Sequence, residues 1–376
     1  MRVYLDNSAT TRPSERVVQA VMHNMQTAYY NPSSLYKPAM EVEKEMTSFR
    51  AMLSCNDHVY FTSGGTEANN IAVFGNRPQT GLNGCILYSA IEHPSVREVC
   101  IAMKRHGRRV EEIPVTQEGI VNLDRLETML KEDTALICVM HVNNETGAIQ
   151  PINEIIALRD RLAPMAGIHV DGVQGFLRVP LDLSYIQSYA ISAHKIHGPK
   201  GIGALIAKKA FKPQPITYGG GQEEGVRSGT ENTPGIAGFK VAVMAYPAEA
   251  NSRMHTLKTE LYHRITQAIP QSRLNGPAVM DKRSAPHILN ISFTPVRSDT
   301  MLYALEGEGV YVSGGSACSS GKSKLSQTLK AMNTPRADAE CAVRFSLSKD
   351  TTREEIDYAA EAVIRQYRLL SQYVRR

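Results

Sequence analysis

The stretch that decides the fold reads IHVDGVQG at residues 168–175 and, after a short link, YAISAHKIHGPKG at residues 189–201. Each part begins as a short, mainly apolar run typical of a buried strand, and the two runs lead to Asp171 and to His194-Lys195. Because the carboxyl ends of strands line the ligand crevice of open α/β sheets, we expect an acid and an amine at one sheet edge. A lysine there can form a Schiff base, and an aspartate can keep a pyridine nitrogen protonated, as pyridoxal phosphate (PLP) requires. A surface lysine and a helix-capping aspartate are the alternative interpretation.

Length and composition narrow the class of protein. A chain of 376 residues exceeds one hydrophobic core, so two domains are expected. The apolar content is 42%, and the net charge of +5 comes from scattered basic residues, which does not indicate nucleic-acid binding. The beginning of the chain lacks an apolar signal segment and no run approaches the length of a membrane span, so we expect a cytoplasmic protein that does not contact membranes. Six cysteines without a C-x-x-C pair favour a reducing compartment and predict no metal site.

Strand and helix patterns alternate along the first two thirds of the chain, which predicts a mainly parallel sheet covered by helices. The expected strands span residues 59–62, 84–90, 135–141, 168–170, 189–192 and 201–207, and the expected helices span residues 13–29, 39–53, 95–106 and 152–162, with another from about residue 66. A helical pattern over 235–268 is interrupted near Pro247. Beyond it we expect strands at 289–293, 310–312 and 342–347 and helices at 299–308, 326–332 and 353–373. The predicted domains are 13–250, and 1–12 together with 251–376.

Polar groups follow several of the predicted strands. TSGGTE at residues 62–67 turns at two glycines into a helix, which suits an anion because free amides and the helix dipole favour phosphate, although a plain turn has the same pattern. His93 follows the strand at 84–90, where a histidine is more often structural than catalytic. The stretch GGGQEEGVRSGTENTPG at residues 219–235 is a long polar loop, and such loops are usually functional.

Cys318 differs from the other cysteines. It lies in SGGSACSSG at residues 313–321, among small and flexible residues, whereas most of the others lie in apolar surroundings. A structural cysteine is rarely found in such a loop, whereas a mobile nucleophile is often found there. Lys322 and Lys324 follow closely and could favour the thiolate.

Together with these stretches, the ordered set YLDNSATT, NPSS, TSGGTEANN, EH, HVNNETG, HVDGVQ, SAHKIHGPKGIG, GGGQEEGVRSGTEN, GSACSSG and VRFSL resembles the cysteine desulfurases. More narrowly, the chain resembles the NifS/IscS-like branch of the class V aminotransferases, from residue 3 to about residue 350. The resemblance implies the PLP-dependent transferase fold type I, which is an α/β fold. Its large domain has a mainly parallel seven-stranded sheet covered by helices, and a smaller α+β domain carries the catalytic cysteine loop.

The resemblance also implies roles for individual residues. Lys195 would bind PLP covalently and move protons, Asp171 would hold the pyridinium proton, and His93 would stack on the ring and assist proton transfer. Gln174 would bond the phenolic oxygen of the ring, and Asn144 would lie close to the ring and the substrate. The phosphate would be held by Gly65, Thr66, Ser192 and His194. Thr230 would reach the phosphate of the other subunit in a homodimer. Asn31 and Arg344 would bind the substrate carboxylate.

Cys318 would accept sulfur from L-cysteine, which leaves L-alanine and a persulfide on Cys318. The sulfur would pass to an acceptor protein, a scaffold or a tRNA-thiolation enzyme, for iron–sulfur cluster or thiolated tRNA and cofactor biosynthesis. A selenocysteine lyase and a catalytically silent scaffold of the same fold are the alternatives. The chain departs from the family pattern after NPSS, where Leu35-Tyr36-Lys37-Pro38 replaces the usual histidine and glycine, and this puts the local packing in doubt.

Overall fold

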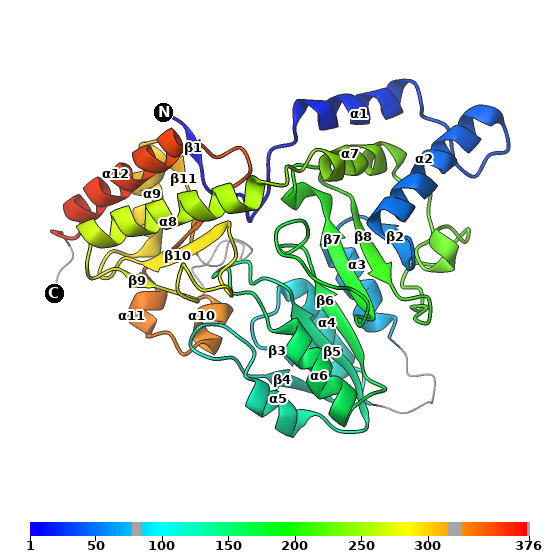
Figure 1. The fold of residues 1–376 in the computed structure, drawn as a ribbon, viewed down its shortest axis with the longest axis horizontal. Coiled ribbons are helices and arrows are strands. Elements are labelled where there is room, and N and C mark those ends of the chain that lie inside the picture. The colour runs from blue at the N-terminus through cyan, green and yellow to red at the C-terminus, as the bar shows by residue number, and fades with distance from the viewer. Residues whose placement is uncertain (77–83, 315–324, 374–376) are drawn as a thin grey trace.

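The computed structural model describes residues 1–76, 84–314 and 325–373 (Figure 1). The strands are β1 (Val3–Tyr4), β2 (His58–Thr62), β3 (Cys85–Ser89), β4 (Val110–Ile113), β5 (Thr134–Met140), β6 (Gly167–Asp171), β7 (Ser188–Ser192), β8 (Gly203–Ala207), β9 (Arg273–Leu274), β10 (Ile288–Ser292), β11 (Val310–Tyr311), β12 (Ser313–Gly314) and β13 (Ala342–Ser346). The α-helices are α1 (Glu15–Gln26), α2 (Lys37–Leu53), α3 (Gly65–Phe74), α4 (Pro94–Arg105), α5 (Leu123–Met129), α6 (Ile152–Leu162), α7 (Thr233–Met244), α8 (Ala250–Ala268), α9 (Ser298–Gly307), α10 (Gln327–Ala331), α11 (Arg336–Ala339) and α12 (Arg353–Leu370).

The larger sheet has seven strands in the order β2-β8-β7-β6-β5-β3-β4. Strands β4, β3, β5, β6 and β7 run parallel, whereas β8 is antiparallel to both β7 and β2. Helices connect most of the parallel strands, because a parallel pair needs a crossover that returns the chain to the same end of the sheet. The predicted α/β fold with a mainly parallel seven-stranded sheet is therefore confirmed.

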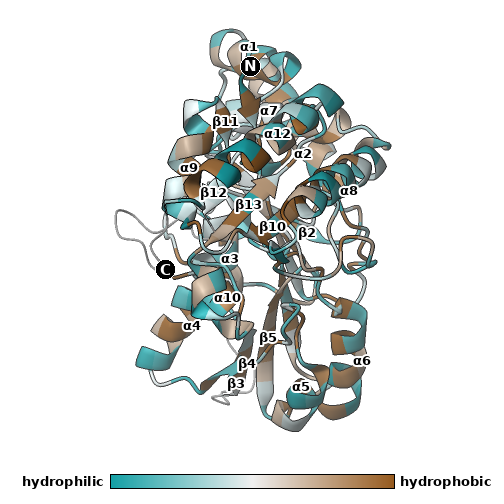
Figure 2. Cartoon of the chain, turned by 90° about the vertical axis from the view of Figure 1, so that its left-hand side faces the viewer, coloured by the Kyte–Doolittle hydropathy of each residue, from teal (hydrophilic) through white to brown (hydrophobic). Residues whose placement is uncertain are grey.

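Both faces of this sheet are buried, as the side-chain alternation of its central strands shows. In β3, Cys85 and Leu87 join the large core formed with α2, α6 and α7, whereas Ile86 and Tyr88 join a second core formed with α4. Continuous apolar strands are expected where helices cover both faces of a sheet. Figure 2 shows the same pattern, since the strands are mainly brown and the outer sides of helices such as α6 are teal.

A second, antiparallel sheet has the order β12-β13-β10-β9 and packs against α8, α9 and α12, at the left of Figure 1. Its core is separate from the cores of the large sheet and includes Val3 and Leu5 from the beginning of the chain. Strand β1 pairs in parallel with β11, which brings the first residues beside the last third of the sequence. Because β1 pairs with β11, residues 6–9, which follow β1, lie between the antiparallel sheet and the seven-stranded sheet.

Most expected elements are present within a few residues of their predicted bounds, and the helical pattern at 235–268 divides into α7 and α8 on either side of Pro247. Strand β4 and helix α5 had not been predicted. In β4 only Val110 and Ile113 are buried and the two residues between them are exposed glutamates, so an edge strand carries little apolar signal. Helix α5 has only seven residues, too few for a clear period. Within the described residues, no helix is long and apolar enough to cross a membrane.

Candidate active site

The parallel pair β6 and β7 places the acid and the amine predicted from the sequence at one sheet edge. Asp171 is the last residue of β6 and lies opposite Ala190 of β7. Lys195 follows β7 in a short 3₁₀ turn, Ala193–Lys195. Asp171 is buried, with 5% of its surface exposed. The two side chains thus come from neighbouring strand ends, where a ligand crevice is expected.

Two hydrogen bonds fix the Asp171 carboxylate. Its Oδ1 accepts from the Val173 backbone at 3.0 Å, and its Oδ2 accepts from Asn69 Nδ2 at 2.8 Å. Asn69 is fully buried in α3, and its Nδ2 also donates to Ser95 Oγ at 2.8 Å. The Asn69 Oδ1 atom lies 3.0 Å from His169 Nε2. The carboxylate therefore has a fixed direction before any ligand binds.

His93 caps the N-terminus of α4 and is connected to the same network. Its Nδ1 accepts from the Ser95 backbone at 3.2 Å and lies 2.8 Å from Ser95 Oγ. Burial lowers the pKa of His93, while Asp171 partly opposes the shift and Lys195 adds to it. His93 is consequently a neutral imidazole at pH 7, and the proton is on Nε2 because Nδ1 acts as the acceptor.

A cradle for an anion forms where β2 leads into α3. The helix begins at Gly65, and Gly64 before it has φ +153°, a value that favours glycine. A Cβ atom at Gly65 would lie 2.5 Å from Val173 Cγ2, so only glycine fits there, and Ser192 of β7 packs alongside. The unpaired amides of the first helical turn, including that of Thr66, are suited to a phosphate.

His194, predicted to join this cradle, lies with its Nδ1 3.2 Å from Thr10 Oγ1. Burial, together with the charges of Lys195 and Lys200, lowers its pKa to about 4. His194 is therefore neutral at pH 7.

The first residues of the chain form one wall of the site. Lys195 Nζ donates to the backbone oxygens of Ser8 at 2.5 Å and Ala9 at 2.9 Å. Gln174, in the turn after β6, donates through Nε2 to the same Ser8 oxygen at 2.9 Å. Gln174 is buried with 4% of its surface exposed. The N-terminal segment thus holds the amine and the carboxamide next to each other.

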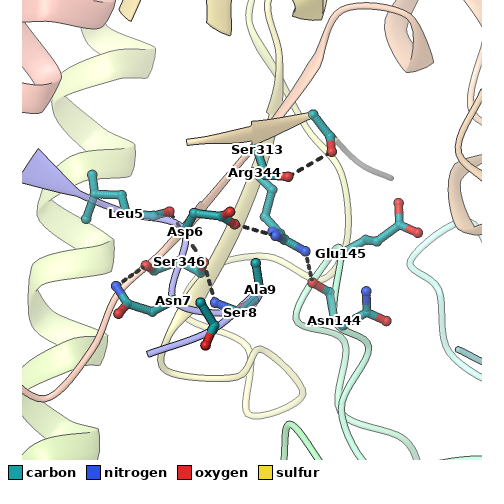
Figure 3. A network of polar contacts seen from close by, with 12 residues as sticks. Leu5, Asp6, Asn7, Ser8, Ala9, Asn144, Glu145, Ser313, Arg344 and Ser346 are labelled. Carbon is teal, nitrogen blue, oxygen red and sulfur yellow. Dashed lines mark hydrogen bonds and ion pairs between the residues drawn. The ribbon is translucent and has the colours of Figure 1, made fainter. Parts of the chain in front are cut away.

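Arg344 reaches the site from β13 in the antiparallel sheet. Its Nη2 pairs with Asp6 Oδ1 at 2.5 Å, and its Nη1 donates to the Asn144 backbone oxygen at 2.9 Å (Figure 3). Only 3% of the guanidinium side chain is exposed. Its buried Nε has no hydrogen-bond partner among the described residues. A buried guanidinium with a donor left over is suited to a planar carboxylate.

Glu145, next to Asn144, connects the site to α10 (Figure 3 shows its position beside Asn144). Its carboxylate accepts from Ser326 Oγ at 2.5 Å and from Thr328 Oγ1 at 3.1 Å. Burial raises the pKa of this carboxyl, although both hydroxyl groups and Arg344 oppose the shift.

Two of the predicted site residues are exposed in loops, and a third lies outside the described residues. Asn31 is exposed in the link between α1 and α2, where its Oδ1 accepts from the Ser33 backbone at 3.0 Å. Thr230 is exposed after the glycine-rich loop. Cys318 lies outside the described residues.

Asp6, Ser8, Asn69 and Ser95 had not been predicted as site residues. Two signals were present in the sequence, since Asp6 and Ser8 belong to YLDNSATT and Asn69 to TSGGTEANN. Asn69 lies four residues after Gly65, one helical turn along α3, so a residue at this spacing faces the same side as the start of the helix.

The chain matches the family model "Aminotransferase class-V" over residues 3–359. The chain belongs to the class-V aminotransferase family. A class-V relative, "Cysteine desulfurase IscS" of Dictyoglomus turgidum, is 36% identical, and the alignment covers 99% of this chain and 96% of the relative. "Cysteine desulfurase NifS" of Azotobacter vinelandii is 35% identical, with 99% and 94% covered.

Solved structures show the same class-V fold. A "NifS-like protein" superposes with a TM-score of 0.87 at 33% identity, covering 99% of this chain and all of the other. The structure "SspA in complex with cysteine" has a TM-score of 0.80 at 27% identity, covering 93% of this chain and all of the other. The predicted resemblance to NifS/IscS-like class-V aminotransferases is confirmed.

Proposed function

We propose that this protein is a PLP-dependent cysteine desulfurase, which converts L-cysteine to L-alanine and retains the sulfur as a persulfide on Cys318. The observation that carries the proposal is that Lys195 and Asp171 come from neighbouring strand ends, while the buried Arg344 of the other sheet contacts the same N-terminal segment as Lys195. Relatives that match nearly the whole chain bear the name cysteine desulfurase, and one similar structure contains cysteine.

The residues of the site fit PLP in two respects. An amine and a fixed carboxylate lie at adjacent strand ends, as a pyridine aldehyde requires. The start of α3 offers free amides beside Gly65, which packs too closely against Val173 for a Cβ, and these amides suit the phosphate. Lys195, Asp171, His93, Gln174, Asn144, Gly65, Thr66, Ser192 and His194 would hold the cofactor. When bound, PLP withdraws electrons from the amino acid Cα and makes its proton acidic.

The side chains of the protein have distinct tasks in this proposal. Lys195 would bind the cofactor covalently and then carry the proton that leaves the substrate Cα. Asp171, with its direction fixed by Asn69, would keep a proton on the pyridine nitrogen. Neutral His93 would cover the ring and exclude water from one face. Arg344, together with Asn31, would bind the substrate carboxylate, with Asn144 close by.

Sulfur transfer needs a thiolate nucleophile, and the resemblance assigns this role to Cys318. The Cys318 thiolate would attack the substrate sulfur, so that an S–S bond forms as the Cβ–S bond breaks. The Cβ carbon keeps the electron pair of the broken bond and takes up a proton, which yields alanine. The proton given up by the Cys318 thiol balances the proton taken up by Cβ, and the substrate's own thiol hydrogen stays on the outer sulfur of the persulfide. This sulfur would then pass to an acceptor protein for iron–sulfur cluster or thiolated tRNA and cofactor biosynthesis.

The proposal includes a cytoplasmic homodimer in which Thr230 contacts the phosphate in the other subunit. Large apolar side chains are exposed on α1, α2 and their link, namely Met22, Met25, Tyr29, Leu35, Tyr36 and Met40. A groove of about 900 Å³ lies between α1, α2 and α7 and is lined in part by Tyr30, Met46 and Met244. The exposed apolar side chains and this groove are in keeping with a surface covered by a second copy. The five described cysteines are free thiols, which supports a reducing compartment. The separate cores support domains at 13–250 and at 1–12 with 251–376.

The replacement Cys318→Ser tests the proposal, because it separates cofactor chemistry from sulfur transfer. Serine preserves size and polarity but is a much weaker nucleophile toward sulfur. The variant should bind PLP and still change its absorbance when cysteine is added, while alanine and persulfide do not accumulate. In the wild type, mass spectrometry after substrate addition should find about 32 Da, one sulfur atom, on the Cys318 peptide. Normal alanine production by Cys318→Ser would refute the mechanism, and Cys55→Ser is the matched control that should stay active.

A further inference from the structure

A buried chain of hydrogen bonds connects the antiparallel sheet to Lys195. His287 is fully buried directly before β10, and its Nε2 lies 3.3 Å from Gln174 Oε1. Gln174 Nε2 donates to the Ser8 backbone oxygen, which also accepts from Lys195 Nζ. His287 therefore contacts the oxygen of the Gln174 carboxamide, while Ser8 contacts its nitrogen.

The Ser8 backbone oxygen, at one end of this series of hydrogen bonds, determines the direction of the bonds from Gln174 and His287. A backbone oxygen can only accept, so the Gln174 group that faces Ser8 is the NH₂ group. The Gln174 oxygen then faces His287, and because this oxygen can only accept, His287 Nε2 must carry a proton. With the carboxamide reversed, two oxygens would face each other at Ser8, and the arrangement would be repulsive.

The surroundings of His287 keep it in the single-proton form that this geometry needs. Burial lowers the pKa of His287 well below 6.5, and the charges of Arg178, Lys258 and Arg344 lower it further. Its Nδ1 is buried and has no hydrogen-bond partner among the described residues. An unpaired lone pair there costs less than an unpaired N–H, because a buried donor without an acceptor loses a strong bond to water. His287 is thus neutral, with its one proton on Nε2.

We propose that His287 is a positioning residue that fixes the Gln174 carboxamide with its NH₂ group toward the Lys195 site. Gln174 uses one of its two N–H groups on Ser8, and the other would be left to donate to the ring oxygen of the cofactor. This step rests on the proposed cofactor. A donor held at this oxygen stabilises its negative charge and so lowers the pH at which the bound cofactor loses its proton. Without His287 only the Ser8 oxygen holds the carboxamide, so the second N–H group is held less firmly toward the ring and part of this stabilisation is lost.

The test is a pH titration of the visible absorbance of the PLP-loaded protein in four forms: wild type, His287→Leu, His287→Gln and Asn275→Leu. The change His287→Leu removes the donor and should raise the midpoint by about 0.5–1 pH unit, the size expected for one hydrogen bond. The change His287→Gln keeps a donor at the end of a similar side chain and should restore the wild-type midpoint. Asn275 is a buried polar residue whose side chain bonds to Asn290 and Ser292, so Asn275→Leu should lower stability without moving the midpoint.

A double variant asks whether His287 acts through Gln174. If it does, Gln174→Leu/His287→Leu should have the same midpoint as Gln174→Leu alone. Additive shifts would overturn the proposal, as would an unchanged midpoint in His287→Leu. A wild type without visible absorbance after PLP addition would overturn the proposed function and this inference together, so the two failures are distinguishable.

A measurement on the unaltered protein covers the case in which His287→Leu does not fold. Nitrogen-15 spectroscopy of the histidine-labelled wild type, with the His287 signal assigned by its loss in His287→Gln, reports which ring nitrogen carries the proton. We expect a protonated Nε2 and an unprotonated Nδ1 at pH 7. Protonation of Nδ1 instead would overturn the proposal, because Nε2 could then not donate to Gln174.

Discussion

Replacing Arg344 with methionine tests the proposed substrate site and its dependence on the N-terminal segment. The guanidinium is 3% exposed and lies between Asp6 and the Asn144 backbone oxygen. Methionine fills most of the volume of the side-chain stem but has no charge and no N–H group. Arg344→Met should therefore weaken cysteine binding and also leave Asp6 without its charged partner.

The structure allows the two effects to be sized separately. Losing one partner of a desolvated charge pair costs about 2–5 kcal/mol, so the KM for cysteine should rise by a factor of about 30 or more. Breaking a buried ion pair costs about 3–5 kcal/mol of folding stability. Because the Asp6 side chain is 21% exposed and partly solvated, we expect a smaller loss, about 1–2 kcal/mol.

The assays are alanine formation at varied cysteine concentration and urea unfolding of the same preparations. The double variant Arg344→Met/Asp6→Asn removes the unpaired carboxylate, so it should regain part of the lost stability while its KM stays high. Arg297→Met is the surface control, since Arg297 is 51% exposed and pairs with Asp299 and Glu340. A KM near the wild-type value in Arg344→Met, or its recovery in the double variant, would place the carboxylate site elsewhere.

Two further changes test the site and the buried histidines. Lys195→Ala should abolish covalent PLP binding and all alanine formation, as spectra and amino-acid analysis would show, and a variant that still forms alanine would contradict the assignment. Burial lowers the pKa of His141 and His169 from 6.5 to about 4, so the unfolded chain binds more protons between these values and stability is lost as the pH falls through this window. Burial raises the pKa of Glu92 to about 8, so above pH 4.5 the folded chain holds one proton there that the unfolded chain has lost. This proton cancels one of the two extra histidine protons of the unfolded chain. The free energy of unfolding should therefore change by about 1.4 kcal/mol per pH unit from these three groups. Urea midpoints that do not fall between pH 6.5 and 4.5 would contradict it.

The strands that deliver the site were predictable because their local pattern is strong. The runs that end at Asp171 and before Lys195 are continuous and buried in the structure, as apolar strands of a covered parallel sheet should be. The turn at Gly64 and Gly65 into α3 was predictable because a glycine turn before a helix has a local cause, and its role in binding an anion stays a prediction. Strand β4 was missed because an edge strand with two exposed glutamates has no apolar signal. Asn31 and Thr230 were assigned by resemblance, and their roles stay predictions.

The sequence by itself determined which chemical groups are present and at which strand ends they occur, because strands and turns follow from short-range patterns of apolar residues and glycine. Only the tertiary structure decided how groups far apart in the sequence combine. Asp6 pairs with Arg344 across 338 positions, and Ser8 accepts from Lys195 across 187. These contacts exist because β1 pairs with β11 and carries the first residues between the two sheets. Nothing local to residues 6–9 specifies their partners, since that depends on long-range packing.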